Sequence, residues 1–131
     1  LHLVVVGAAP SVPGALAERV HALGWVEDMP ALYHGASFLL HPSRYDPCSL
    51  VVLEALACGL GVVTTRADGA AQFVTPERGA VVEAADDPAL VAACRRLCDP
   101  AEAAAAQAAA AGFCRTWEQV ARDLLEAATS A

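Results

Sequence analysis

The chain has 131 residues, of which 56% are hydrophobic and 18% are charged, and its formal net charge is −7. This length is typical of one domain, and the composition is sufficient for a buried core, which excludes a disordered chain. The basic residues are all arginines, scattered along the sequence with only Arg95 and Arg96 adjacent. Because nucleic-acid binders carry a clustered basic face, we discount nucleic acid as a partner of this chain. The sequence does not indicate binding to a membrane surface either.

Five cysteines stand among apolar residues, at positions 48, 58, 94, 98 and 114. Their number is odd, and no Cys-x-x-Cys or paired-histidine spacing occurs, so we expect reduced thiols packed as small hydrophobes, a cytoplasmic location and no structural zinc. The sequence shows no secretory signal and no apolar run long enough to span a bilayer. It begins at Leu1 within a strand-like run, which suggests a piece of a longer protein.

Strand-like and helical runs alternate along the first two thirds of the chain. The predicted elements are, in order, a strand at 1–6 buried on both faces, a loop at 7–14, a strand at 19–23, a helix capped by Asp28 and running to Gly35, a strand at 37–41, a helix at 49–58, a strand at 61–65, a short helix or turn at 69–74 and a strand at 79–83. Short buried strands that alternate with helices predict an α/β fold with a Rossmann-like, doubly wound parallel sheet.

Helices follow to the end of the chain. One is expected from Asp87 to Cys98, an alanine-rich surface helix from 99 to 111, and an amphipathic helix opened by the capping box of residues 116–119. The last helix carries one apolar stripe, formed by Trp117, Val120, Ala121, Leu124, Leu125 and Ala128. We therefore divide the chain into a core at 1–98 and C-terminal helices at 99–131.

Two carboxylates lie eight positions apart in residues 46–54, which read DPCSLVVLE. Asp46 follows the predicted strand 37–41, whereas Glu54 lies in a helix whose other residues are apolar. Ligands of doubly wound sheets bind beyond the carboxyl ends of the strands, so a ligand is expected at this turn. Because a buried, ionised carboxylate is costly unless it is paired, Glu54 requires a partner, and a ligand hydroxyl is a suitable one.

The start of the helix at Ser49 offers a place for a phosphate, since the first amides of a helix lack partners and carry partial positive charge. We expect the amides of Cys48, Ser49 and Leu50 to face such a ligand. Glu54 lies about 7.5 Å further along the helix axis, where it suits a vicinal diol such as a ribose.

Asp46 would reach hydroxyls on the other side of the phosphate, so the spacing fits a sugar–phosphate–nucleoside ligand. The alternative from spacing alone is that Glu54 pairs with Arg66 and that Asp46 only caps the helix.

Several motifs together carry a family resemblance. Residues 41–59 (HPSRYDPCSLVVLEALACG) and 62–69 (VVTTRADG) resemble the signature of the retaining GT-B glycosyltransferases of group 1. That family carries Glu-x7-Glu at this place in its C-terminal, nucleotide-sugar-binding domain. Three more matches occur in the family's order, namely the base-binding loop and following helix at 24–33, the late strand at 79–82 and the start of the closing helix at 117–118. The resemblance covers nearly the whole chain.

The resemblance implies binding of a nucleoside-diphosphate sugar and transfer of its hexose-type sugar with retention, with no metal or other cofactor. The implied site consists of Asp46 at the transferred sugar as the catalytic residue, Glu54 at the ribose hydroxyls, the amides of Ser49 and Leu50 at the phosphates with that of Cys48 beside them, and the backbone of Val26 at the base. Asp46 and Ser49 depart from the Glu and Gly that are usual at their positions.

The resemblance also implies that parts of the enzyme are missing from these residues. The first strand–helix unit, with an Arg and a Lys for the diphosphate, and the N-terminal acceptor-binding domain would both precede Leu1. We therefore expect the isolated chain to be inactive in transfer and its sheet to be incomplete. Two alternatives stay open, a non-catalytic nucleotide-binding or assembly module of the same fold and a fragment of a GT-B nucleotide-sugar epimerase.

Overall fold

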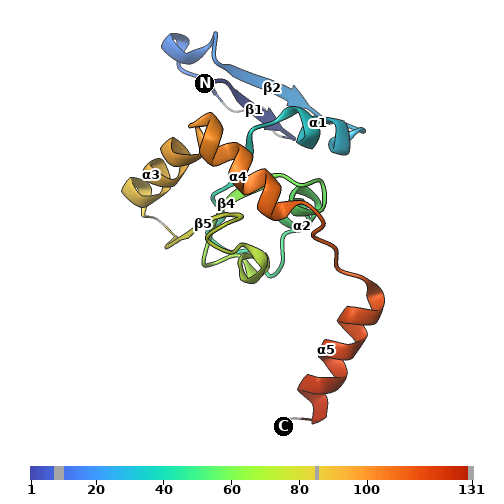
Figure 1. Cartoon of the computed structure of the whole chain (residues 1–131). Coiled ribbons are helices and arrows are strands. Elements are labelled where there is room, and N and C mark those ends of the chain that lie inside the picture. The colour runs from blue at the N-terminus through green and yellow to red at the C-terminus, as the bar shows by residue number, and fades with distance from the viewer. Residues whose placement is uncertain (8–10, 85, 130–131) are drawn as a thin grey trace.

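The computed structural model describes residues 1–7, 11–84 and 86–129, so part of the predicted loop at 7–14 lies outside the described residues (Figure 1). The strands are β1 (Leu3–Val6), β2 (Val20–Gly24), β3 (Phe38–His41), β4 (Gly61–Thr65) and β5 (Gly79–Val82). The α-helices are α1 (Met29–Gly35), α2 (Leu50–Ala57), α3 (Asp87–Leu97), α4 (Pro100–Ala110) and α5 (Trp117–Thr129), and two short 3₁₀ helices are η1 (Gly14–Leu16) and η2 (Gly69–Phe73). The predicted alternation of strands and helices is confirmed.

The strands are parallel, as predicted, but they form two sheets among the described residues. One contains β1 and β2, and the other has the order β3-β4-β5. β1 was expected to be buried on both faces, yet Leu3 and Val4 are each 44% exposed. The physical reason is that, in the part of the chain that the structure describes, β1 pairs only with β2 and none of its residues belongs to the buried core clusters.

The core lies on the two faces of the β3-β4-β5 sheet. Side chains alternate along a strand, so Val62 of β4 packs on the face covered by α1 and α2, whereas Val63 packs on the face covered by α3. Because β3 and β4 pair in parallel, their carboxyl ends lie side by side at one edge of this sheet, and the predicted site begins there.

The alanine-rich helix α4 is part of the core and not a surface helix. Ala103, Ala106 and Ala110 are buried, and the small side chain of Ala106 allows close approach to β4. A Cβ atom added at Gly61 would lie 2.9 Å from the Cβ of Ala106. The boundary predicted after residue 98 therefore cuts through the packed body, which extends through α4.

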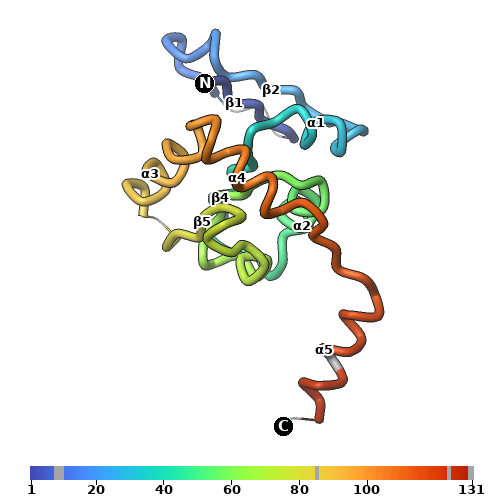
Figure 2. The backbone as a smooth tube through the Cα atoms, in the orientation of Figure 1, coloured from blue at the N-terminus to red at the C-terminus, as the bar shows by residue number. Residues whose placement is uncertain are grey.

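The last helix, α5, extends away from this body (Figures 1 and 2). The predicted capping box is confirmed, because Gln119 N–H donates to Thr116 Oγ1 and Thr116 N–H donates to Gln119 Oε1. Trp117 and Leu125 of the predicted stripe are exposed, and the side chain of Leu124 lies outside the described residues. Within the described residues, none of the helices has both the length and the apolar character needed to cross a membrane.

Candidate functional site at the carboxyl ends of β3 and β4

The turn after β3 and the loop after β4 are joined by backbone hydrogen bonds. Asp46 N–H donates to Ala67 O at 3.1 Å, and Gly69 N–H donates to Asp46 O at 2.9 Å. Asp46 and Asp68 consequently form an isolated parallel bridge beyond the ends of the strands. A Cβ atom on Gly69 would lie 1.8 Å from Pro47 O, so only glycine permits this approach of the two segments.

Asp68 is the buried centre of this junction, with a relative exposure of 2%. Its Oδ1 accepts hydrogen bonds from the amides of Ser49 and Ala70, at 3.2 and 2.8 Å. Its Oδ2 accepts from the hydroxyls of Ser49 and Thr64, the latter at 3.0 Å. Four donors therefore compensate the burial of one negative charge.

The protonation of Asp68 follows from this environment. Burial raises the pKa of its carboxyl group, but the hydrogen bonds from Ser49, Ala70 and Thr64 outweigh burial and hold the pKa below its usual range. The group is therefore ionised at neutral pH, and a negative charge lies directly at the start of α2. A phosphate placed at this helix start would therefore lie near this charge as well as near the helix amides.

The amides predicted to bind phosphate are only partly available. The Ser49 amide is bonded to Asp68, and the Cys48 amide donates to Asp46 Oδ1 at 3.0 Å. Neither carboxylate bonds the Leu50 amide in the part of the chain that the structure describes. Sequence spacing located the helix start correctly but could not reveal that two nearby carboxylates already occupy two of the three amides.

Asp46 lies beside His41, the last residue of β3. Asp46 Oδ2 is 3.6 Å from His41 Nε2, and Asp68 Oδ2 is 3.9 Å from the same nitrogen. His41 Nε2 is buried and has no hydrogen-bond partner among the described residues. The imidazole stands between the two carboxylates as a potential donor to either.

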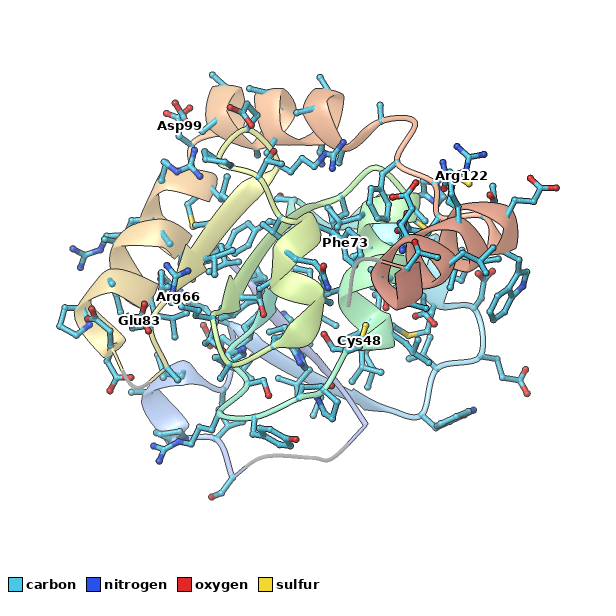
Figure 3. All side chains as sticks on the ribbon, turned by 90° about the horizontal axis from the view of Figure 1, so that it is seen from below. Cys48, Arg66, Phe73, Glu83, Asp99 and Arg122 are labelled. Carbon is cyan, nitrogen blue, oxygen red and sulfur yellow. The ribbon has the colours of Figure 1, made fainter. Side chains whose placement is uncertain are left out.

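Glu54 differs from the sequence prediction in its surroundings. It is exposed, not buried, because its position on α2 faces away from the apolar side that contacts the sheet. Its partner is the hydroxyl of Tyr33, which donates to Glu54 Oε2 at 3.0 Å. The alternative pairing of Glu54 with Arg66 is wrong, since Arg66 Nε binds Glu83 Oε1 at 2.6 Å, and Figure 3 shows these two side chains together.

The segment predicted to bind the base lies just before α1. Val26 is half-buried, whereas the neighbouring Trp25 is 87% exposed. Asp28 caps α1 as predicted, by accepting from Ala31 N–H at 3.0 Å. The segment that would carry the base is thus anchored to the helix that carries Tyr33.

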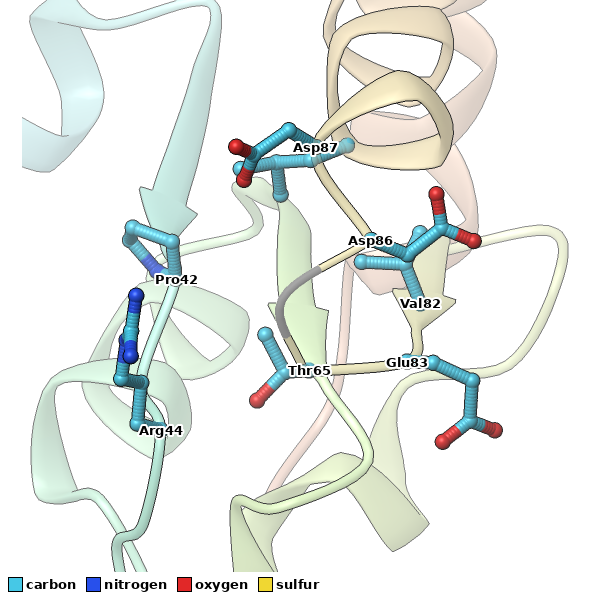
Figure 4. A pocket seen from close by; sticks show the side chains of 8 residues that line it. Pro42, Arg44, Thr65, Val82, Glu83, Asp86 and Asp87 are labelled. Carbon is cyan, nitrogen blue, oxygen red and sulfur yellow. The ribbon is translucent and has the colours of Figure 1, made fainter.

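A small cavity opens at the carboxyl ends of β3, β4 and β5 (Figure 4). Its volume is about 60 Å³, and Pro42 and Arg44 line one side of it, opposite the segment that contains Glu83, Asp86 and Asp87. Asp46 and Glu54 do not line this cavity, which is far smaller than the several hundred Å³ of a typical ligand pocket. The candidate site is an open surface, and this cavity alone cannot enclose a nucleotide sugar.

Two residues of the site were not predicted as such. Asp68 was not predicted because the loop after β4 neither begins a predicted helix nor contains a pair of spaced carboxylates. A polar residue just beyond the end of a strand is nevertheless a usable signal of a binding site. The other is Tyr33, a core residue with 4% exposure, whose hydroxyl also reaches Glu54. Only the packing of α1 against α2 brings these two residues together.

Parallel strands with helices on both faces, and joined loops at their carboxyl ends, define a Rossmann-like α/β domain. Residues 1–100 match the family described as glycosyl transferases of group 1, and the chain belongs to that family. Its fold corresponds to the C-terminal half of a GT-B structure, as the sequence predicted.

Individual relatives agree with this assignment. The chain is 37% identical over 99 residues to the lipopolysaccharide core biosynthesis mannosyltransferase LpcC of Rhizobium leguminosarum, covering 74% of this chain and 28% of that protein. The crystal structure of WaaG, a glycosyltransferase of lipopolysaccharide biosynthesis, aligns with a TM-score of 0.67 at 30% identity and covers 86% of this chain and 34% of WaaG. Anabaena HepE, solved in complex with UDP-glucose, aligns with a TM-score of 0.67 at 25% identity, covering 89% of this chain and 34% of HepE. The chain thus spans about a third or less of the length of these relatives.

Proposed function

We propose that the chain is the donor-binding part of a retaining glycosyltransferase that transfers a hexose-type sugar from a nucleoside-diphosphate sugar. The observation that carries the proposal is the Glu54 carboxylate, which is exposed on α2 and held at one oxygen by Tyr33. It lies on the helix that begins at the carboxyl end of β3, where a ligand of this fold binds. The UDP-glucose in the HepE complex supports a ligand of this kind.

Each part of the ligand has a place in this proposal. The ribose hydroxyls bond to Glu54, the backbone of Val26 bonds to the base, and Asp46 contacts the transferred sugar. The Leu50 amide receives a phosphate, and the Ser49 and Cys48 amides do so only by sharing their bonds with Asp68 and Asp46. Because the phosphate lies near two carboxylates, we expect positive charge from outside residues 1–131 to complete the site. The N-terminal, acceptor-binding domain would also come from there.

A binding experiment tests the donor site. We would titrate the chain with UDP, GDP and ADP by calorimetry and compare the wild type with Glu54→Gln. Losing a charged acceptor for ribose hydroxyls is expected to weaken binding by at least about tenfold, because hydrogen bonds to charged groups contribute about 1.5–3 kcal/mol. Glu118→Gln, an exposed residue of α5, is the matched control. Equal affinity of Glu54→Gln and the wild type would refute the role of Glu54.

Transfer is a separate question from binding. We propose that the chain alone transfers no sugar, and incubation with a panel of nucleotide sugars and water or sugar acceptors would detect any product. Appreciable transfer or donor hydrolysis would contradict this part of the proposal while leaving the binding site intact.

A second candidate is a non-catalytic nucleotide-binding module of the same fold. The observation that favours it is the occupation of the Ser49 and Cys48 amides by carboxylates, which weakens the phosphate site. The two proposals differ for the full enzyme, since only the first predicts that an Asp46 variant abolishes transfer while nucleotide binding persists.

A further inference from the structure

The contact between Tyr33 and Glu54 joins a rigid residue to an exposed one. The ring of Tyr33 is buried in the same core cluster as Val52 and Leu56 of α2, so the place of its hydroxyl is fixed by packing. Glu54 has a long side chain on the exposed face of α2. Such a side chain samples several rotamers unless a partner holds it, and that freedom is lost when a ligand binds.

The hydroxyl of Tyr33 stays a donor over the whole neutral range. Burial, the hydrogen bond to Glu54 and the negative charge of Glu54 all raise the pKa of Tyr33 well above its ordinary value. The phenol therefore keeps its proton at neutral pH, and it donates that proton to Glu54 Oε2.

The carboxylate retains capacity for a ligand. An ionised carboxylate has about four lone-pair positions, of which the Tyr33 hydroxyl uses one, on Oε2. Within the described residues, Oε1 has no hydrogen-bond partner. About three lone-pair positions therefore remain, which is enough to accept both hydroxyls of a vicinal diol.

Tyr33 also connects two parts of the proposed nucleotide site. It lies within α1, whose first turn is capped by Asp28 immediately after the segment that contains Val26. The same short helix therefore supports the base-binding segment at its start and the ribose-binding carboxylate through Tyr33. A nucleoside carries a base and a ribose at a fixed distance from each other, so α1 supports the binding of both.

We propose that Tyr33 is a positioning residue that holds the Glu54 carboxylate for the vicinal diol of a ribose, and thereby makes the site selective for ribonucleotides. This inference rests on the proposed donor-binding function. It adds Tyr33 to the proposed site and predicts a selectivity for ribonucleotides. This selectivity depends on a hydroxyl that does not itself contact the nucleotide.

The test compares the binding of two ligands to the wild type and to variants of Tyr33 and Glu54. The nucleoside diphosphate that binds best among UDP, GDP and ADP is titrated into the wild type and Tyr33→Phe, and so is its 2′,3′-dideoxy analogue. We expect Tyr33→Phe to weaken binding of the ribonucleotide about five- to tenfold and to change binding of the dideoxy analogue less than twofold. In the Glu54→Gln background, Tyr33→Phe should cause no further loss of ribonucleotide affinity.

Tyr45→Phe is the matched control, because Tyr45 is the other tyrosine of the chain and is exposed. It should keep the wild-type ratio of the two affinities. Since both ligands are titrated into the same sample, this ratio does not depend on the fraction of Tyr33→Phe that is folded.

The outcomes separate the proposals. An equal loss of affinity for both ligands would mean that Tyr33 only supports the core, and an unchanged ribonucleotide affinity would mean that it does not position Glu54. Either result overturns the inference and leaves the donor-binding function standing. Failure of the wild type to bind any of the three nucleotides would overturn the proposed function and this inference with it.

Discussion

The hydroxyl of Ser49 donates a hydrogen bond to the buried carboxylate of Asp68, and the amide of Ser49 donates to the other oxygen of the same group. The residue before α2 is thus bonded twice to the loop after β4. These two hydrogen bonds hold the start of α2 against the end of the neighbouring strand. One of them also occupies an amide at the helix start that would otherwise be available to an anion.

The first prediction concerns Asp68 and acid stability. Its carboxyl group has a lower pKa in the folded than in the unfolded chain, so its contribution to stability is complete above about pH 4 and is lost as the pH falls through the lower, folded value. Asp68→Asn should lower the free energy of unfolding at pH 7 by about 1–3 kcal/mol. Urea unfolding from pH 7 to pH 2.5 should show this difference shrinking below about pH 4.

Asp28→Asn is the control for Asp68→Asn, since asparagine caps a helix about as well as aspartate and Asp28 is exposed. It should cost little at any pH. A difference for Asp68→Asn that is the same at pH 7 and pH 3 would contradict the assigned role of the ionised group.

The second prediction concerns Tyr33 and alkaline stability. The pKa of Tyr33 is raised in the folded chain, so its stabilising contribution is complete below about pH 10 and is lost as the pH rises toward the folded value. Above about pH 10 the wild type should lose unfolding free energy more steeply than Tyr33→Phe, by at most about 1.4 kcal/mol per pH unit. Tyr45→Phe should retain the wild-type slope, and identical slopes for all three proteins would contradict the prediction.

The third prediction concerns Gly69, which lies against Pro47. A Cβ atom there would overlap Pro47 O, so Gly69→Ala should displace the turn and lower the free energy of unfolding by about 1–3 kcal/mol. Nucleotide binding should weaken in parallel, because Asp46 and Ser49 belong to the displaced turn.

Gly35→Ala provides the comparison for Gly69→Ala, because nothing lies within 4 Å of a Cβ atom at Gly35 at the end of α1. Thermal unfolding should show little change or a slight gain for Gly35→Ala. Equal stabilities of the two variants would show that the turn accommodates the added methyl group.

The fourth prediction concerns Arg78, which connects η2 with the end of α4 and with Phe113 in the segment that follows α4. Its guanidinium donates to Ala109 O at 3.2 Å and to Phe73 O at 3.3 Å, and lies 5.3 Å from the centre of the Phe113 ring. Lysine cannot supply this planar set of donors, so Arg78→Lys should destabilise the chain by about 1–2 kcal/mol. Amide hydrogen exchange at Phe113 should accelerate, whereas Arg95→Lys on the exposed side of α3 should leave it unchanged. Unaltered exchange in Arg78→Lys would refute this connecting role.

Local chemistry allowed most elements to be predicted from the sequence. The caps at Asp28 and Thr116 and the strand at 61–65 each depend on residues that are close in the sequence, and each is found where it was expected. The errors concern burial. A pattern of apolar residues cannot tell whether a second layer covers them, so β1 is more exposed and α4 more buried than predicted.

The position of the candidate site was also predictable, whereas its internal bonding was not. Asp46 and Glu54 lie at a strand end and on the following helix, as their spacing indicated. The partners of Glu54 and of the Ser49 amide come from distant parts of the sequence. Tyr33 precedes Glu54 by 21 residues, and Asp68 follows Ser49 by 19.

The sequence by itself determined the α/β fold, the family resemblance and the turn where a ligand is expected, because strand and helix signals and the motif at 41–59 are local. Only the tertiary structure decided which groups of that turn remain free. It placed a buried carboxylate on the Ser49 amide and a buried tyrosine on Glu54. The physical reason is that a hydrogen bond depends on distance in space, and the packing of β3 beside β4 and of α1 on α2 sets those distances.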